Sequence, residues 1–153
     1  MNSDFVELLA AFNEQSVEYL VVGAHALAAH GHVRATKDLD VWVKPDLQNS
    51  ARVLRALAEF GAPLHDLTVE DLSRPGLIFQ MGVEPVRIDV ITRIDGVEFD
   101  EAWPDRVVTR LGGETVPVIS RAHLIANKKA AGRLQDLADV ERLERLGDSR
   151  QRP

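Results

Sequence analysis

The chain has 153 residues, enough to form one domain with an ordinary hydrophobic core. Its composition is 45% hydrophobic and 27% charged, a balance typical of globular proteins rather than disordered or fibrous ones. The sequence contains no cysteine, which excludes disulfides and thiolate metal sites, and its net charge of −6 argues against non-specific binding to duplex nucleic acid.

The N-terminal segment, residues 1–15, carries acids where a signal peptide would carry lysine and arginine. No apolar run approaches the length of a membrane span. We therefore expect a cytoplasmic protein without membrane contact. One domain is expected over residues 1–147, followed by a disordered tail at residues 148–153.

The first half of the chain alternates helical and extended patterns. A first helix is predicted to end before Ser16, with Ser3 or Asp4 as its cap. The apolar run 19–22 predicts a strand that stops at Gly23, and a short helix follows at once, over 24–30. A second strand is predicted over 38–43. A long amphipathic helix should then start at Pro45 and run to about Phe60.

The second half adds two hairpins and a helical end. Residues 63–75 are predicted as a loop with one helical turn. The runs 77–81 and 86–91 suit a hairpin, and residues 110–118 contain another, with its turn at 112–113. The chain is predicted to be helical from Ser120, with a break at Gly132. These elements indicate a single mixed α/β (α+β) domain.

Two aspartates, Asp38 and Asp40, stand at the start of the second predicted strand. Side chains alternate across a strand, so both carboxylates point to the same face. Burying two carboxylates that repel each other is costly unless a cation lies between them. Oxygen ligands of this kind suit Mg²⁺, or Mn²⁺ in its place. The pair therefore predicts a metal site.

A third acid, Asp89, lies inside another predicted strand, and Arg87 precedes it on the same face. Three carboxylates on adjacent strands suit a two-metal phosphoryl or nucleotidyl transfer. Two ions would bridge the phosphate, and the third acid would act as general base or shared ligand. A structural alternative needs no metal: Asp38 caps a strand end, Asp89 pairs with Arg87, and Asp40 pairs with a cation of the preceding loop.

Other residues near this strand suit phosphate. Gly23 lies between a strand and a helix N-terminus, where backbone N–H groups and the helix dipole accept anions. Arg34 and Lys37 are the loop cations beside the two acids, and they suit contacts to a triphosphate or a pair with Asp40. Thr36 is able to donate its hydroxyl to phosphate or to cap the strand.

Three motifs in order resemble a known superfamily. "YLVVGAHALAAHGHVRATKDLDVWV" (19–43) resembles the first motif of the nucleotidyltransferases that share the polymerase-β palm fold. Its R-x-T-x-D-h-D form is similar to AbiEii-like and related small bacterial families, which include toxins of toxin–antitoxin pairs. "RIDVIT" (87–92) resembles the third-carboxylate strand, and "LIANKKAAGRLQDLADVERL" (124–143) resembles the closing helical motif. The resemblance covers most of residues 17–146.

The resemblance implies a palm with a mixed sheet flanked by helices, two Mg²⁺ or Mn²⁺ ions, and a nucleoside triphosphate such as ATP as substrate. The implied catalytic and metal-binding residues are Asp38, Asp40 and Asp89. The implied nucleotide-contacting residues are Gly23, Ala24, Lys128 or Lys129, and Arg133. Asp136 and Asp139 would orient Arg133 or Arg142, or bind directly. Ala24 departs from the family pattern, in which Ser or Gly is common, so a hydroxyl contact to the triphosphate is missing.

We therefore expect transfer of a nucleoside monophosphate to an acceptor hydroxyl. The acceptor is left open between a protein, a tRNA end and a small molecule. Residues 121–153 hold eight Lys and Arg against five Asp and Glu, which favours an RNA end, unless these charges form a salt-bridged helix face. A partner protein or a homodimer is also left open. The alternatives are a non-catalytic nucleotide-binding or antitoxin module, and a metal-dependent phosphohydrolase.

Overall fold

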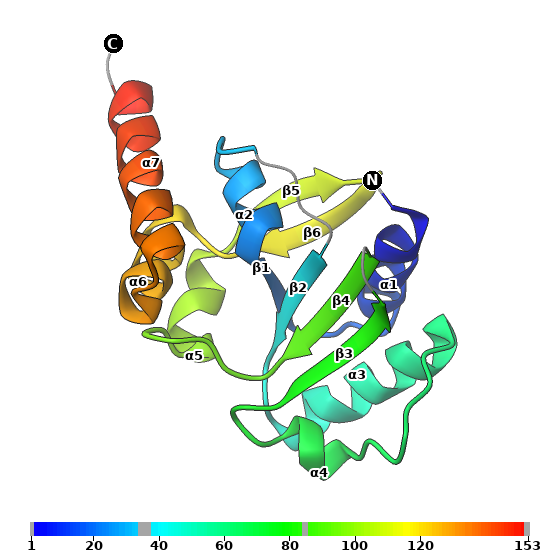
Figure 1. The fold of residues 1–153 in the computed structure, drawn as a ribbon. Helices are drawn as coiled ribbons and strands as arrows, with labels where there is room; N and C mark the ends of the chain where they lie inside the picture. The colour runs from blue at the N-terminus through cyan, green and yellow to red at the C-terminus, as the bar shows by residue number, and fades with distance from the viewer. Residues whose placement is uncertain (1, 34–37, 84–85, 152–153) are drawn as a thin grey trace.

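The computed structural model describes residues 2–33, 38–83 and 86–151. Within them, six strands form one mixed sheet in the order β3-β4-β2-β1-β6-β5 (Figure 1). The strands are β1 (Tyr19–Val22), β2 (Asp38–Val43), β3 (Ile78–Val83), β4 (Val86–Ile91), β5 (Val107–Leu111) and β6 (Glu114–Val118). The helices are α1 (Ser3–Glu14), α2 (Gly23–Ala29), α3 (Leu47–Phe60), α4 (Val69–Leu72), α5 (Phe99–Ala102), η1 (Trp103–Asp105), α6 (Arg121–Ala131) and α7 (Leu134–Gln151).

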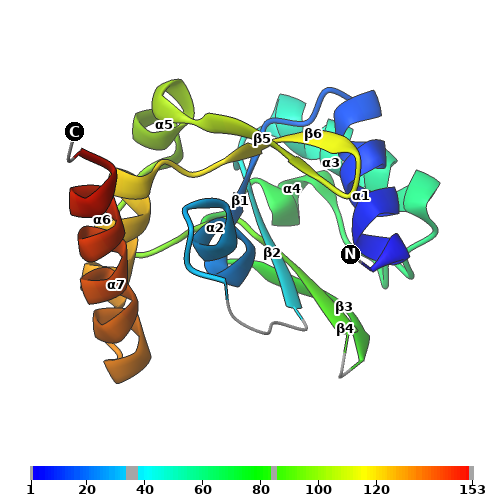
Figure 2. The same ribbon diagram turned by 90° about the horizontal axis from the view of Figure 1, so that it is seen from above.

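The sheet lies between two groups of helices. Figure 2 shows α1, α3 and α4 on one side of the sheet, and α2 with the α6–α7 pair on the other. On the α3 side, Leu39, Val41 and Val43 alternate along β2 and are fully buried in the hydrophobic core. Their burial fixes the register of β2, because a one-residue slip would move all three to the opposite face. Asp38 and Asp40 consequently lie on the α2 side.

The predicted mixed α/β domain is confirmed, and both predicted hairpins are present. β3 and β4 pair antiparallel, as do β5 and β6. β2 pairs antiparallel with β1 and parallel with β4, which places it in the middle of the sheet. The predicted break in the last helix is also found, since Gly132 adopts a left-handed conformation at φ 69° between α6 and α7. α7 continues to Gln151, beyond the boundary expected at residue 147.

Two helix starts differ from the sequence prediction. The cap of α1 is Asn2 rather than Ser3 or Asp4, because the Asn2 side chain accepts a hydrogen bond from the Asp4 backbone N–H at 2.8 Å. α3 begins after Pro45, because the Asp46 carboxylate accepts the Asn49 backbone N–H at 2.7 Å and so caps the helix.

The segment between the two hairpins holds structure that the sequence pattern did not predict. α5 and η1 are only four and three residues long, too short for helical periodicity to be recognised. They bring Phe99 and Trp103 against each other, with ring centroids 5.5 Å apart, and Phe99 also contacts Trp42. No helix in the described part of the chain is long and apolar enough to cross a membrane.

Candidate active site

Three carboxylates lie side by side at the centre of the sheet. In the parallel pair β2–β4, Asp40 stands opposite Asp89, and Asp38 stands opposite Arg87. Alternation along both strands turns these four side chains to the same face. The sequence patterns at the two strands therefore describe a single site.

Arg87 bridges two of the carboxylates. Its Nε donates to Asp89 Oδ1 at 3.0 Å, and its Nη2 lies 3.3 Å from Asp89 Oδ2. The same Nη2 lies 3.3 Å from Asp38 Oδ2. A pair between Asp89 and Arg87 was part of the structural alternative to metal binding. The structure contains this pair, and Arg87 also contacts Asp38.

The ionised form of Asp40 is disfavoured at this site. Burial, and after it repulsion from Asp89 and Asp38, raise the pKa of Asp40 to about 6, although the charge of Arg87 acts in the opposite direction. A hydrogen bond with Asp89 also favours the protonated form. A cation close to Asp40 would favour the ionised carboxylate, because it would offset the repulsion from the other two carboxylates.

The donor chemistry of the three acids fits a hard divalent cation, which prefers carboxylate oxygens. Across residues 2–33, 38–83 and 86–151, no group of three or more His, Cys, Asp or Glu side chains is arranged as a ready metal site. The guanidinium of Arg87 instead lies against Asp38 and Asp89. The predicted loop residues Arg34, Thr36 and Lys37 lie outside the described residues, so their contacts stay predictions.

Gly23 brings the start of α2 against the acids. Its φ is 67°, a conformation that side-chain-bearing residues rarely adopt, and a Cβ there would overlap the Asp40 carboxylate. The residue before it, Val22, offers no side-chain cap to α2. The first turn of α2 therefore begins beside Asp40, and its backbone N–H groups receive no cap from the Val22 side chain.

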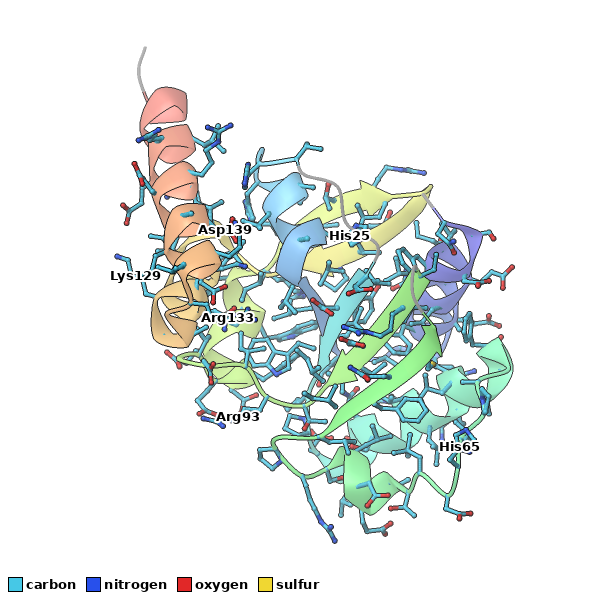
Figure 3. All side chains as sticks on the ribbon, in the orientation of Figure 1. His25, His65, Arg93, Lys129, Arg133 and Asp139 are labelled. Carbon is cyan, nitrogen blue, oxygen red and sulfur yellow. The ribbon has the colours of Figure 1, made fainter. Side chains whose placement is uncertain are left out.

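A pocket of about 550 Å³ extends from Gly23 and Asp40 to the helices α6 and α7. Apolar and polar side chains share its lining, and three of the lining side chains are cationic. Figure 3 shows two of them, Arg133 at the junction of α6 and α7 and Arg93 on the loop after β4. The lining residues include Val22, Ile78, Ile91, Arg93, Ile94, Asn127, Lys128 and Arg133. A pocket that joins carboxylates to cations suits a polyphosphate held with a metal ion.

Two buried aspartates of α7 hold the cations on α6 and at the α6–α7 junction. Lys128 Nζ lies 3.4 Å from Asp136 Oδ1 and 3.1 Å from Asp139 Oδ2, and all three side chains are at most 8% exposed. Arg133 Nε donates to Asp136 Oδ2 at 2.7 Å. Burial alone would raise the pKa of Asp136, but the hydrogen bond from Arg133 and the charge of Lys128 lower it overall. Asp136 thus orients both cations at the pocket wall.

Asp139 has a second set of contacts behind this wall. Gln135 Nε2 donates to Asp139 Oδ1 at 2.9 Å, and His32 Nε2 lies 3.7 Å from the same oxygen. The loop after α2 is thereby linked to α7. Lys129 lies elsewhere, 58% exposed and paired with Glu144 at 3.3 Å. Of the two lysines that the closing motif left open, Lys128 lines the pocket.

Sequence reasoning missed Arg93 and Asn127 as lining residues. Arg93 follows the predicted strand 86–91 by two residues, and the end of a strand next to an acidic site was the signal available. Asn127 precedes Lys128 within the quoted closing motif, and its Nδ2 donates to the Asp95 backbone carbonyl at 2.9 Å. This hydrogen bond ties α6 to the loop after β4.

A family model described as "Nucleotidyl transferase of unknown function (DUF2204)" matches residues 1–152. A search of curated proteins gives no match. The finer likeness to AbiEii-like families is not tested by these comparisons and stays a prediction.

Among solved structures, a lincosamide antibiotic adenylyltransferase, LnuA, bound to lincomycin is similar at 14% identity and a TM-score of 0.60, covering 95% of this chain and 98% of that one. A Thermotoga maritima protein described as a candidate nucleotidyltransferase is similar at 13% identity and a TM-score of 0.58, covering 95% and 91%. ANT(2")-Ia in complex with adenylyl-2"-tobramycin is similar at 15% identity and a TM-score of 0.55, covering 95% and 93%. At these identities the likeness concerns the fold.

Proposed function

The chain belongs to the nucleotidyl transferase family whose model matches residues 1–152, and on this premise we propose that it transfers a nucleoside monophosphate from a nucleoside triphosphate to an acceptor hydroxyl. The observation that carries the proposal is that three carboxylates lie next to a cation-lined pocket, at the Gly23 turn. The carboxylates supply oxygen ligands for a divalent ion, and the pocket supplies positive charge for the phosphates, as the reaction needs.

The residues have distinct roles in this proposal. Asp38, Asp40 and Asp89 would hold Mg²⁺ or Mn²⁺, which supplies charge neutralisation at the phosphates when bound. The backbone at Gly23 and Ala24 receives a phosphate, and Lys128, Arg133 and Arg93 balance the remaining negative charge. The apolar side chains of Ile91 and Ile94 offer a surface for the nucleobase.

The acceptor approaches from the β3 side. Gln80 on β3 stands opposite Asp89 and is exposed, and β3 is an edge strand of the sheet. The acceptor hydroxyl oxygen attacks the α-phosphorus, and Asp89, the acid nearest to this edge, accepts the hydroxyl proton. The bond between the α-phosphorus and the bridging oxygen breaks, and pyrophosphate leaves with that bonding pair.

Label transfer tests the proposal. The purified protein is incubated with each α-labelled nucleoside triphosphate and Mg²⁺ or Mn²⁺, with and without a cell extract that is afterwards divided into protein, RNA and small-molecule fractions. The matched controls are Asp40→Asn at the site and Asp105→Asn at an exposed position. We expect label on one fraction, equal in wild type and Asp105→Asn, and lost in Asp40→Asn. A γ-labelled triphosphate should leave the same fraction unlabelled.

Other outcomes distinguish the alternatives. Release of free phosphate or mononucleotide without an acceptor would support a phosphohydrolase. Metal-dependent triphosphate binding without label transfer would support a regulatory or antitoxin module. Because one structural neighbour holds adenylylated tobramycin, small hydroxylated molecules are the first acceptor class to test, before proteins and tRNA ends. A role in a toxin–antitoxin pair stays a prediction, tested by isolation of a stable complex with a second protein.

A further inference from the structure

Arg87 is a cation built into the sheet where the carboxylates meet. It contacts Asp89 through two nitrogen atoms and Asp38 through one, at 3.0 to 3.3 Å. We propose that Arg87 is the resident counter-cation of the carboxylate site, that it competes with the divalent ion for the oxygens of Asp38 and Asp89, and that it thereby sets the metal affinity. The proposal rests on the metal-dependent function proposed above.

Arg87 and a divalent ion would compete because they would bind to oxygens of the same carboxylates. The guanidinium uses Oδ2 of Asp38 and both oxygens of Asp89, and a divalent ion would bind to carboxylate oxygens of the same residues. A hard cation that approached them with the guanidinium in place would meet a positive charge at short range. Metal binding therefore requires Arg87 to give up part of its contact with at least one carboxylate.

The surroundings of Arg87 leave room for such a movement. The side chain is 31% exposed, in contrast to the 12% exposed side chain of Asp89. The residue opposite it on β3 is Gly82, which is exposed and places no side chain beside the guanidinium. A larger residue does not fit at position 82, because a Cβ there would lie 2.6 Å from the Val86 carbonyl oxygen. Among the described residues, the position opposite Arg87 on β3 therefore adds no side chain that would hold the guanidinium in place.

The alternative role for Arg87 is to orient Asp89 for the metal, and the two roles predict opposite effects. If Arg87 competes, its removal strengthens metal binding, because the guanidinium that contacts Asp38 and Asp89 no longer repels the ion. If Arg87 only orients Asp89, its removal leaves metal binding unchanged or weaker, because the ligand becomes mobile. Metal affinity measured without nucleotide separates the two roles and requires no turnover.

The experiment is a Mn²⁺ titration of the full-length protein, followed by electron paramagnetic resonance of the free ion. We expect Arg87→Gln to bind Mn²⁺ at least about tenfold more tightly than wild type, since one neighbouring charge within 4–6 Å shifts a carboxylate equilibrium by this order. Arg87→Lys, which retains the charge, should stay close to wild type. Arg106→Gln, the same change at a distant arginine over Trp103, should not alter the affinity.

A second measurement keeps the inference testable if Arg87→Gln does not fold. In Arg87→Ala, millimolar methylguanidinium should weaken Mn²⁺ binding back toward the wild-type value, while methylammonium at equal ionic strength should do so less. Equal or weaker Mn²⁺ binding in folded Arg87→Gln, or no effect of methylguanidinium, would overturn the inference. If Arg87→Gln binds Mn²⁺ more tightly but the wild type transfers no label, the inference about Arg87 is supported and only the transferase proposal fails. If Mn²⁺ binds to neither the wild type nor the variants, the inference and the metal-dependent function both fail.

Discussion

Gly23 and Asp40 approach each other so closely that the Asp40 carboxylate fills the space that a Cβ on Gly23 would need. The Gly23 turn and the acidic strand are thus one structural unit. Because β1 and β2 pair antiparallel with Val22 opposite Asp40, the turn cannot shift without moving the acid. This relationship gives the first test of the site.

Gly23→Ala should weaken triphosphate binding at least tenfold, because the new Cβ displaces Asp40 and the φ of 67° is strained for alanine. Gly113→Ala is the matched control: its φ is 89°, and nothing lies within 4 Å of its Cβ position. Both variants should lose about 1 kcal/mol of stability from backbone strain. Nucleotide affinity by calorimetry and thermal unfolding separate the two effects. Equal loss of affinity in both variants would contradict the role of the Gly23 turn.

Asp40→Asn should stabilise the metal-free protein at neutral pH while it removes transfer. The folded pKa of Asp40, about 6, lies above the ordinary aspartate value of 3.8. Ionisation in the folded state is therefore unfavourable, and the wild type loses stability as the pH rises from about 4 to about 6. The asparagine lacks this ionisation. The gain at pH 7.5 should be about 3 kcal/mol.

Thermal unfolding at pH 7.5 and pH 4.5, with chelator present, measures this gain. We expect the difference between Asp40→Asn and wild type to shrink at the lower pH. Added Mn²⁺ should raise the melting temperature of the wild type more than that of the variant. A variant less stable than wild type at pH 7.5 would show that Asp40 is not under electrostatic strain.

Lys128 and Lys129 are neighbours in sequence with very different surroundings. Lys128→Met should cost about 3 to 5 kcal/mol, because it leaves Asp136 and Asp139 buried with less compensation. Lys129→Met should change stability by less than about 0.5 kcal/mol, since its pair with Glu144 is exposed. Urea unfolding measures both. Similar costs for the two variants would argue against the buried ion cluster.

Arg121 joins α6 to α7 through a backbone contact. Its Nε and Nη2 donate to the Leu143 carbonyl at 2.9 and 2.7 Å, and a Cβ on Gly147 would overlap the guanidinium. Gly147→Ala should therefore destabilise the wild type, although alanine is the better helix former. In an Arg121→Ala background the same change should be neutral or stabilising by up to about 1 kcal/mol. Additive effects in this double-mutant cycle would contradict the contact.

Local sequence patterns predicted much of the fold because the core residues follow simple periodicities. The alternation in β2 placed Asp38 and Asp40 on one face, and Gly23 after the run 19–22 marked the turn from β1 into α2. The spacing of Arg87 and Asp89 also indicated their pair. These relationships lie within a strand or between a strand and the next turn.

Contacts between distant segments could not be predicted in the same way. The bridge from Arg87 to Asp38 depends on the parallel pairing of β2 with β4, which is separated from it by a hairpin strand and two helices. The choice of Lys128 over Lys129 depends on which side of α6 faces the sheet. Arg93 lines the pocket because of the path of the loop after β4, and no periodic pattern specifies that path.

The most direct test of the central claim is anomalous diffraction from crystals that contain Mn²⁺ and a triphosphate with a non-hydrolysable link between the α- and β-phosphates. We expect Mn²⁺ at the oxygens of Asp38, Asp40 and Asp89, with the phosphates between the Gly23 turn and Lys128. Mn²⁺ or triphosphate bound elsewhere, for example in the pocket beside Trp42 and Phe99, with Asp38 and Asp89 still paired with Arg87, would contradict the claim.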